Sequence, residues 1–378
     1  RKASDLHLKV GGHPVIRVDG QLQTLVNVKR LMQEDTVAMA FSMMNGRQKQ
    51  RFKEELGIDI AYSVPGLGRF RVNIFQQRGS VSLVLRVIPA RILDIRELML
   101  PPVLEKICDQ PRGLVLCTGT TGSGKSTTLA AMLDYINGRR AEHIITVEDP
   151  IEFLHRDKKS IINQRELDVD TYGFAPALRS ALRQDPDVIL VGEMRDFETI
   201  ETALLAAETG HLVFSTLHTL DATETINRII SVFPPHQQKQ IRIQLSQVLN
   251  SVISMRLLPR ADGQGRVPAV EVLISTPYIR ECIEIKERTK YIREQIALGT
   301  SQYSMQTFDQ SLHSLYKTGL ITLDEAMLRA SNPDEFRLKL QGVQFTADAA
   351  REQMESMLET AGGEPIEVND EPLELEQG

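Results

Sequence analysis

Tryptophan is absent from the 378 residues, and aromatic residues make up only 5% of them. A protein that binds single-stranded nucleic acid by stacking bases on aromatic rings needs more such side chains. The three cysteines, Cys108, Cys117 and Cys282, are too few and too widely spaced for a disulfide framework or a CxxC zinc pair. We therefore expect the protein to work in a reducing compartment.

Long apolar runs are also missing, since none approaches the roughly 18 residues that a membrane-spanning helix needs. We see no charged start followed by an apolar stretch and a small-residue cleavage site, so no secretory signal is visible. These absences favour a cytoplasmic location.

Charge is distributed unevenly along the chain. The net charge is −6, and residues 364–378 hold six acids but no lysine or arginine. Without this tail, 44 basic residues are matched by 44 acidic ones. The body of the protein therefore has no overall attraction for nucleic acid or anionic lipid. Because the tail is acidic and poor in apolar residues, we expect it to be disordered.

Residues 1–88 are predicted to form a small α+β domain. The dipeptide Asp19-Gly20 lies between two alternating runs and supplies the positive φ angles of a tight hairpin turn. Helical-period apolar positions follow over residues 33–56, with a break at their middle, and then come three more strand-like runs. Residues 89–111 contain four prolines, and we interpret them as an interdomain linker.

From residue 112 to residue 276, short apolar runs alternate with helical segments, which is typical of a parallel sheet covered by helices. The predicted strands are 114–117, 143–147, 188–191, 212–215, 252–257 and 267–273. Residues 277–345 are predicted to be helical, and residues 346–378 form the acidic tail. The fold class is therefore α/β, with a smaller α+β domain at the N-terminus.

Residues 119–126 match the P-loop pattern GxxxxGK[ST] at every fixed position. Its glycines let successive backbone N–H groups point at phosphate oxygens, its lysine reaches the β- and γ-phosphates, and its serine ligates Mg²⁺. An apolar run precedes the loop and a helical pattern follows it, as a P-loop requires. The predicted nucleotide-binding residues are Gly119, Thr120, Thr121, Gly122, Ser123, Gly124, Lys125, Ser126 and Thr127.

Two predicted strands end in glutamate. Glu193 follows the run 188–191, and Glu148 follows the run 143–147. In a P-loop sheet, carboxylates at strand ends lie near Mg²⁺ and the attacking water. We expect one glutamate to position the metal and the other to activate water, but the spacing does not say which does which.

His211 and His218 flank the predicted strand 212–215. A histidine can hydrogen-bond a γ-phosphate without carrying a fixed charge, although a lone histidine is more often structural. Arginines gather at the end of the first domain. Most are expected to be ordinary surface ion-pair partners, but some could approach a phosphate across an interface as arginine fingers. The candidates are Arg69, Arg71, Arg78 and Arg86.

Four segments in this order carry a family resemblance: 119–126 (Walker A), 145–153 (Asp box), 182–196 (Walker B) and 210–218 (His box). With them the chain resembles the hexameric ATPases of type II secretion and type IV pili, over nearly its whole length to about residue 342. Within that family it is similar to the pilus retraction, or twitching-motility, ATPases.

The resemblance implies a PAS-like N-terminal domain, a RecA-like ATPase core and a homohexamer with ATP between domains. It implies that Lys125 and Ser126 hold phosphates and Mg²⁺, that Glu193 belongs to the metal shell and that Glu148 is the base for water. His211 and His218 are implied near the γ-phosphate. Arginines of the first domain are implied to approach nucleotide in the ring.

Assembly-type members of the family carry a tetracysteine zinc module, which this chain lacks. A motif that the retraction motors need appears at residues 276–281, with Tyr278 where alanine is usual. The implied partners are an inner-membrane pilus platform protein and a paralogous retraction ATPase, at the cytoplasmic face of the membrane. The acidic tail leaves open that the chain is itself the accessory paralogue.

Two other functions compete with an ATP-driven pilus motor. A RecA-like nucleic-acid motor is disfavoured by the neutral body and the few aromatics. A nucleotide-dependent scaffold without hydrolysis is disfavoured because Lys125, Ser126, Glu148 and Glu193 are all present. A GTPase is disfavoured because no Asn-Lys-x-Asp motif occurs.

Overall fold

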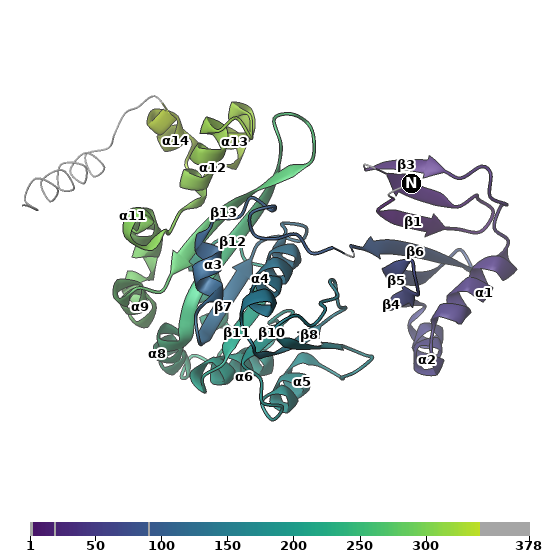
Figure 1. The fold of residues 1–378 in the computed structure, drawn as a ribbon, viewed down its shortest axis with the longest axis horizontal. Helices are drawn as coiled ribbons and strands as arrows, with labels where there is room; N and C mark the ends of the chain where they lie inside the picture. The colour runs from purple at the N-terminus through teal and green to yellow at the C-terminus, as the bar shows by residue number, and fades with distance from the viewer. Residues whose placement is uncertain (1–2, 19, 90, 341–378) are drawn as a thin grey trace, which may run out of the picture.

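The computed structural model describes residues 3–18, 20–89 and 91–340, which form two lobes, each built around one β-sheet (Figure 1). The acidic tail expected at residues 346–378, and residues 341–345 of the expected helical region, lie outside the described residues.

The first lobe is an antiparallel sheet with strand order β3-β2-β1-β6-β5-β4. Its strands are β1 (Asp5–Leu8), β2 (Val15–Val18), β3 (Gln21–Thr24), β4 (Gly57–Val64), β5 (Gly68–Gln77) and β6 (Ser80–Ile88). The predicted hairpin is confirmed, because Val18 of β2 pairs with Gln21 of β3. The predicted helical region is two helices, α1 (Gln33–Met43) and α2 (Gly46–Glu55), and Asn45 caps the second.

Helices α1 and α2 cover one face of this sheet. Ala40 and Phe52 from the helices are buried against Val72 and Ile74 from β5. Because side chains alternate along a strand, the arginines of β5 lie on the opposite face of the sheet. The face without helices is therefore the charged face of the first lobe.

The second lobe contains a seven-stranded sheet in the order β13-β12-β7-β11-β10-β8-β9. Its strands are β7 (Gly113–Thr118), β8 (His143–Glu148), β9 (Ile161–Glu166), β10 (Val188–Val191), β11 (Leu212–Leu217), β12 (Leu249–Pro259) and β13 (Arg266–Ile274). Neighbours are parallel except for β12 and β13. All six predicted strands are confirmed, whereas β9 was not predicted because its polar residues give no apolar run.

Helices lie on both faces of this sheet (Figure 1). One buried cluster joins the sheet to α5 (Phe174–Ala181), α6 (Phe197–Glu208), α7 (Ala222–Ser231) and α8 (Gln238–Val248), and the other joins it to α3 (Val103–Cys108) and α4 (Lys125–Arg139). The second cluster also buries Ile95 and Leu100. The segment predicted as a linker thus contributes apolar residues and a short helix to the core.

Helical segments follow the second sheet, as expected. They are α9 (Pro277–Glu284), the 3₁₀ helix η1 (Lys286–Tyr291), α10 (Ile292–Leu298), α11 (Thr300–Tyr303), α12 (Phe308–Lys317), α13 (Leu323–Arg329) and α14 (Pro333–Leu340). Phe308 and Leu312 of α12 pack on Leu258 and Val267 from β12 and β13. Within the described ranges, every helix is too short or too polar to cross a bilayer, and Cys108, Cys117 and Cys282 are free and buried.

Candidate functional site

The P-loop connects β7 to α4. Its glycines at positions 119, 122 and 124 all have positive φ angles, of 140°, 80° and 101°. A Cβ atom on Gly119 would lie only 2.5 Å from the carbonyl oxygen of Met255 and from Ser123 Oγ. Glycine is therefore required at position 119 both by the backbone conformation and by space.

The lysine of the loop is folded back over it. Lys125 is 8% exposed, and its Nζ donates hydrogen bonds to the carbonyl oxygens of Gly119 (2.8 Å) and Thr120 (3.0 Å). Burial lowers the pKa of this ammonium group. The neighbouring hydroxyl Ser123 Oγ is buried without a hydrogen-bond partner. An ammonium held only by uncharged loop carbonyls, and a hydroxyl without a partner, both fit the oxygens of a phosphate group.

Ser126 and Thr127 occupy the first turn of α4, directly after Lys125. The N-terminus of a helix attracts anions because its first N–H groups have no partner within the helix. Among the described residues there is no cluster of three His, Cys, Asp or Glu side chains that could hold a metal by itself. Mg²⁺ is usually held by one or two side chains together with phosphate oxygens, which is the kind of site that the sequence predicts for Ser126 and Glu193.

Two glutamates and a histidine share the P-loop's edge of the sheet. Strands β7, β8, β10 and β11 run parallel, so the residues that follow their carboxyl ends lie along one edge. Glu148 ends β8, Glu193 follows β10 by two residues, and His218 follows β11 directly. The prediction that these residues would gather near the phosphate loop is therefore supported by the topology.

Glu148 is held by donors from its own strand, from the neighbouring strand β9 and from the loop that follows it. Its Oε1 accepts hydrogen bonds from Thr146 Oγ1 (2.6 Å) and Gln164 Nε2 (3.1 Å), and its Oε2 accepts one from the backbone N–H of Glu152 (3.4 Å). Burial raises the pKa of this carboxyl, and the hydrogen bonds oppose that rise. Sequence reasoning missed Thr146 and Gln164, since neither belongs to a recognisable acidic or basic pattern.

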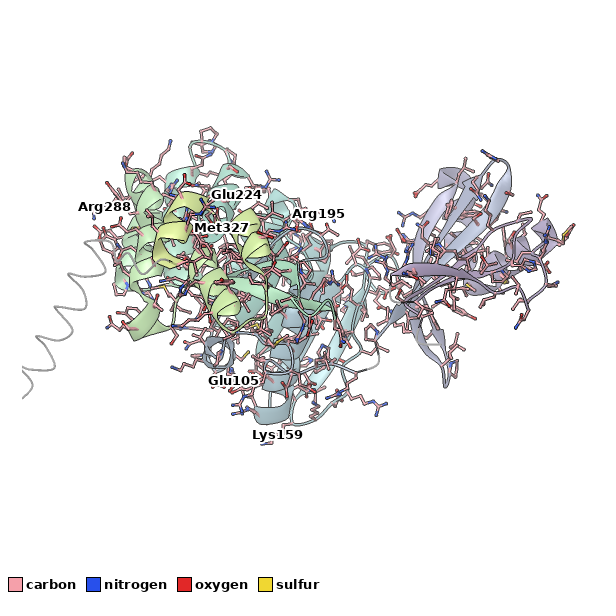
Figure 2. The ribbon with its side chains drawn as sticks, turned by 90° about the horizontal axis from the view of Figure 1, so that it is seen from above. Glu105, Lys159, Arg195, Glu224, Arg288 and Met327 are labelled. Atoms are coloured by element: carbon pink, nitrogen blue, oxygen red, sulfur yellow. The ribbon has the colours of Figure 1, made fainter. Side chains whose placement is uncertain are left out.

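Glu193 contacts two cationic or protonatable groups through one oxygen. Its Oε1 lies 2.6 Å from Arg195 Nε and 3.2 Å from His218 Nε2. The hydrogen bond to Glu193 raises the pKa of Arg195. Figure 2 places Arg195 at the side of the second lobe that faces the first lobe. Arg195 was not among the predicted site residues, although it lies within the Walker B segment, four residues after the end of β10.

His211 does not join this group. It precedes β11, and its Nδ1 lies 2.8 Å from the carbonyl oxygen of Ala206. The six residues of β11 separate it from His218, so the seven steps between the two histidines span roughly 23 Å at about 3.3 Å per residue. Within one chain, therefore, the two histidines lie at opposite edges of the sheet, and the expectation that both reach one γ-phosphate is wrong for a site built by a single chain.

The arginine candidates have different environments. Arg69 forms an ion pair with Glu166 of β9, and this ion pair joins the two lobes. Arg71 lies opposite Arg86 on the charged face of the first lobe. Arg86 Nε donates to Asp5 Oδ1 at 2.9 Å, yet 70% of the Arg86 side chain remains exposed. Arg78 has a φ of 50° in the turn between β5 and β6.

Further contacts between the lobes were not predicted. Arg51 of α2 forms an ion pair with Asp168, and the Arg47 guanidinium lies 4.8 Å from the centre of the Tyr172 ring. Asp149 is also relevant, because burial raises its pKa while Arg71 and Arg195 lower it. An arginine from each lobe therefore acts electrostatically on the residue that follows Glu148.

A cavity of about 710 Å³ lies away from this site, at the opposite edge of the second sheet. It is lined by the start of β7 and β12, the end of β13, and residues such as Lys106, Arg112 and Arg280. The P-loop, the glutamates and His218 do not line this cavity, and they identify the other edge of the sheet as the candidate site.

Comparison with known proteins agrees with this geometry. Residues 1–364 match the family model described as "Type II/IV secretion system protein". The chain is 50% identical over 334 residues to the type IV pilus retraction ATPase PilT of Pseudomonas aeruginosa, which covers 88% of the chain and 96% of that protein. It is 40% identical over 346 residues to the type IV pilus ATPase PilU of the same organism, covering 91% of the chain and 90% of that protein.

A solved structure is similar as well. The crystal structure of the pilus retraction motor PilT with bound ADP matches with a TM-score of 0.81 and 51% sequence identity. The match covers 88% of this chain and 95% of that one.

Proposed function

The chain belongs to the type II/IV secretion system protein family, and on this premise we propose that it is a pilus retraction ATPase, which hydrolyses ATP to ADP and phosphate. The observation that carries the proposal is the common sheet edge of Lys125, Glu148, Glu193 and His218. The 50% identity to a retraction ATPase over most of both chains, and the likeness to an ADP-bound motor, support it.

In the proposed site, the backbone amides of the P-loop and Lys125 bind the β- and γ-phosphates of ATP. Lys125 exchanges its two loop carbonyls for phosphate oxygens. Ser126 and Glu193 would hold Mg²⁺, which supplies charge neutralisation on the phosphates when it is bound. The hydroxyls of Ser123 and Thr127 would add donors to the same oxygens.

Glu148 is the proposed general base, because its raised pKa suits a group that must take a proton from water. Thr146 and Gln164 fix the carboxylate from one side, which leaves its remaining acceptor sites for water. His218 is proposed to orient Glu193 and to donate toward the γ-phosphate side of the site. His211 has no part in this mechanism within the same chain.

The first lobe is proposed to be PAS-like and the second RecA-like, assembled as a homohexamer. The exposed guanidinium groups on the charged face of the first lobe would approach ATP of a neighbouring subunit, and Arg71 and Arg86 are the best placed of the four candidates. Arg69 is paired with Glu166 in the same chain, and Arg78 lies in a turn. The ring would work at the cytoplasmic face of the inner membrane, against a pilus platform protein.

The second candidate function is that of an accessory retraction ATPase similar to PilU. Identity favours the principal retraction motor, at 50% against 40% for PilU. A PilU-like paralogue then becomes a proposed partner rather than an alternative identity. A RecA-like nucleic-acid motor remains the more distant alternative.

Phosphate release from the purified full chain tests the proposal. Wild type should hydrolyse ATP, while Lys125→Ala and Glu193→Ala should each lose about 100-fold or more in rate. Lys125 would neutralise charge on the phosphates directly, and Glu193 would hold the Mg²⁺ that does the same. Lys159→Ala, an exposed lysine outside the site (Figure 2), should match wild type. Wild type as inert as both variants would remove the enzyme claim, and stimulation by single-stranded DNA would favour the nucleic-acid motor.

A further inference from the structure

A row of polar side chains crosses the strands next to the P-loop. Thr118, the last residue before the loop, pairs in register with Ser254 of β12, and Ser254 pairs with Glu271 of β13. Residues directly opposite each other on adjacent strands have side chains on the same face. Thr118 Oγ1 donates to Ser254 Oγ at 3.0 Å, which confirms this for the first pair. All three side chains are buried.

Glu271 connects this row to the segment that carries His218. Its Oε1 accepts a hydrogen bond of 2.9 Å from the backbone N–H of Ala222, the first residue of α7. Only residues 219–221 lie between His218 and this amide. Thr219 is fixed by its hydroxyl, 2.6 Å from Thr225 Oγ1. The connection from β11 to α7 is therefore held at its far end by a carboxylate from a different strand.

Burying a carboxylate at this position is energetically unfavourable. Glu271 is 4% exposed, and burying a charge with few partners costs several kcal/mol, so an apolar side chain would serve the core better. Its acceptor role at Ala222 explains the choice, because the first N–H groups of a helix have no partner inside the helix and the helix dipole favours an anion there.

From this arrangement we propose that Glu271 is a positioning residue for ATP hydrolysis: it holds the N-terminus of α7, and through residues 219–221 it keeps His218 beside Glu193. The inference rests on the proposed ATPase function. It does not require Glu271 to touch the nucleotide, since the carboxylate acts through the backbone of Ala222.

The charged groups around Glu271 set its protonation. Burial raises the pKa of its carboxyl to about 7, and Asp221 at the start of α7 raises it further. The hydrogen bond from Ala222, Arg256 of β12 and Arg293 of α10 lower it. As the pH rises through this value the carboxyl ionises, and its hydrogen bond to the Ala222 amide becomes charge-assisted and stronger. We therefore expect the pH profile of kcat to contain a component that increases as the pH rises through about 7.

Hydrogen exchange and kinetics of the full chain test the inference. Glu271→Ala should speed amide exchange in residues 219–225 by about tenfold or more, because the helix terminus loses its acceptor. Glu271→Gln keeps an acceptor oxygen and should change exchange less than about threefold. Glu284→Gln, a glutamate that instead accepts from Ser246, is the control and should behave as wild type.

The kinetic readouts separate this inference from the proposed function. Glu271→Ala should lower kcat for ATP by about tenfold with the KM within about twofold, since residues that bind nucleotide are untouched. The pH profile of kcat for Glu271→Gln should lack the component near pH 7 that wild type has.

If wild type hydrolyses ATP but neither exchange nor the pH profile changes in the Gln and Ala variants, the positioning role is wrong while the function stands. An inactive wild type would overturn the proposed function, and the exchange result would still decide whether Glu271 holds α7. If the Ala variant does not fold, the Gln profile alone decides the question.

Discussion

Arg69 of the first lobe and Glu166 of the second form an ion pair in which the carboxylate side chain is only 4% exposed and the guanidinium side chain 17%. Glu166 also accepts a hydrogen bond of 3.2 Å from the backbone N–H of Ile151, in the segment that follows Glu148. Burial raises the pKa of Glu166 in spite of the arginine. The pair therefore links the position of the first lobe to the strand end that carries the proposed base, at a considerable desolvation cost.

Arg69→Met should destabilise the protein strongly at pH 8, because it leaves an ionised carboxylate buried without a counter-charge. We expect the thermal midpoint to fall by about 5–10 °C. The loss should be smaller at pH 5: Glu166 has a folded pKa above its unfolded value, so protonation as the pH falls relieves the buried charge.

The double variant Arg69→Met/Glu166→Gln is the control for this prediction, since it removes both charges and keeps an acceptor for Ile151. At pH 8 the double variant should regain most of the decrease in thermal midpoint of unfolding that Arg69→Met causes. A double variant as unstable as the single one would mean that packing of the Arg69 side chain, rather than the charge of Glu166, is what stabilises the contact.

Glu148→Gln should bind ATP but hydrolyse it about 100-fold or more slowly than wild type, because an amide cannot accept the proton of the attacking water. Binding of a fluorescent ATP analogue and phosphate release measure the two effects separately. Glu201→Gln, on the exposed face of α6, should be indistinguishable from wild type. Loss of binding together with hydrolysis would indicate that Glu148 holds the site together instead of serving as the base.

Thr146→Val should shift the acidic limb of the pH–rate profile to higher pH. The Thr146 hydroxyl lowers the pKa of Glu148, so without it the carboxyl stays protonated to a higher pH and the base form appears later. The plateau at high pH should stay within about threefold of wild type, because valine keeps the β-branched shape of threonine and leaves the Glu148 carboxylate itself in place. Thr202→Val removes a hydroxyl bonded to the Glu198 carbonyl far from the site and should leave the limb in place. An unchanged limb in Thr146→Val would show that another group controls it.

The parts of the fold that follow from local signals could be predicted from the sequence. The P-loop, the apolar core strands and the glutamates at strand ends all have fixed spacing and chemistry, and they lie where expected. Strand β9 could not be predicted, because as an edge strand with polar residues it has neither an apolar run nor a clean alternation.

Side-chain partners from distant elements escaped prediction for a different reason. Gln164 and Glu271 depend on which strands become neighbours, and sequence order does not give strand order in a sheet. The expectation for His211 failed because spacing along the chain does not give distance in space. His211 and His218 lie at the two ends of β11, close in sequence but far apart in the structure.

Gly119 and Gly122 make a matched pair for testing the P-loop, because both have positive φ but only Gly119 is crowded. Gly122→Ala meets no atom within 4 Å, so its cost is the backbone strain of alanine at φ 80°, about 1–2 kcal/mol. Gly119→Ala adds a clash with the Met255 carbonyl and Ser123, and it must push β12 or the loop aside. ATP affinity, measured with the fluorescent analogue, should therefore fall by about 5- to 30-fold in Gly122→Ala and beyond detection in Gly119→Ala. Equal losses in the two variants would mean that φ alone, and not the contact with β12, limits the shape of the loop.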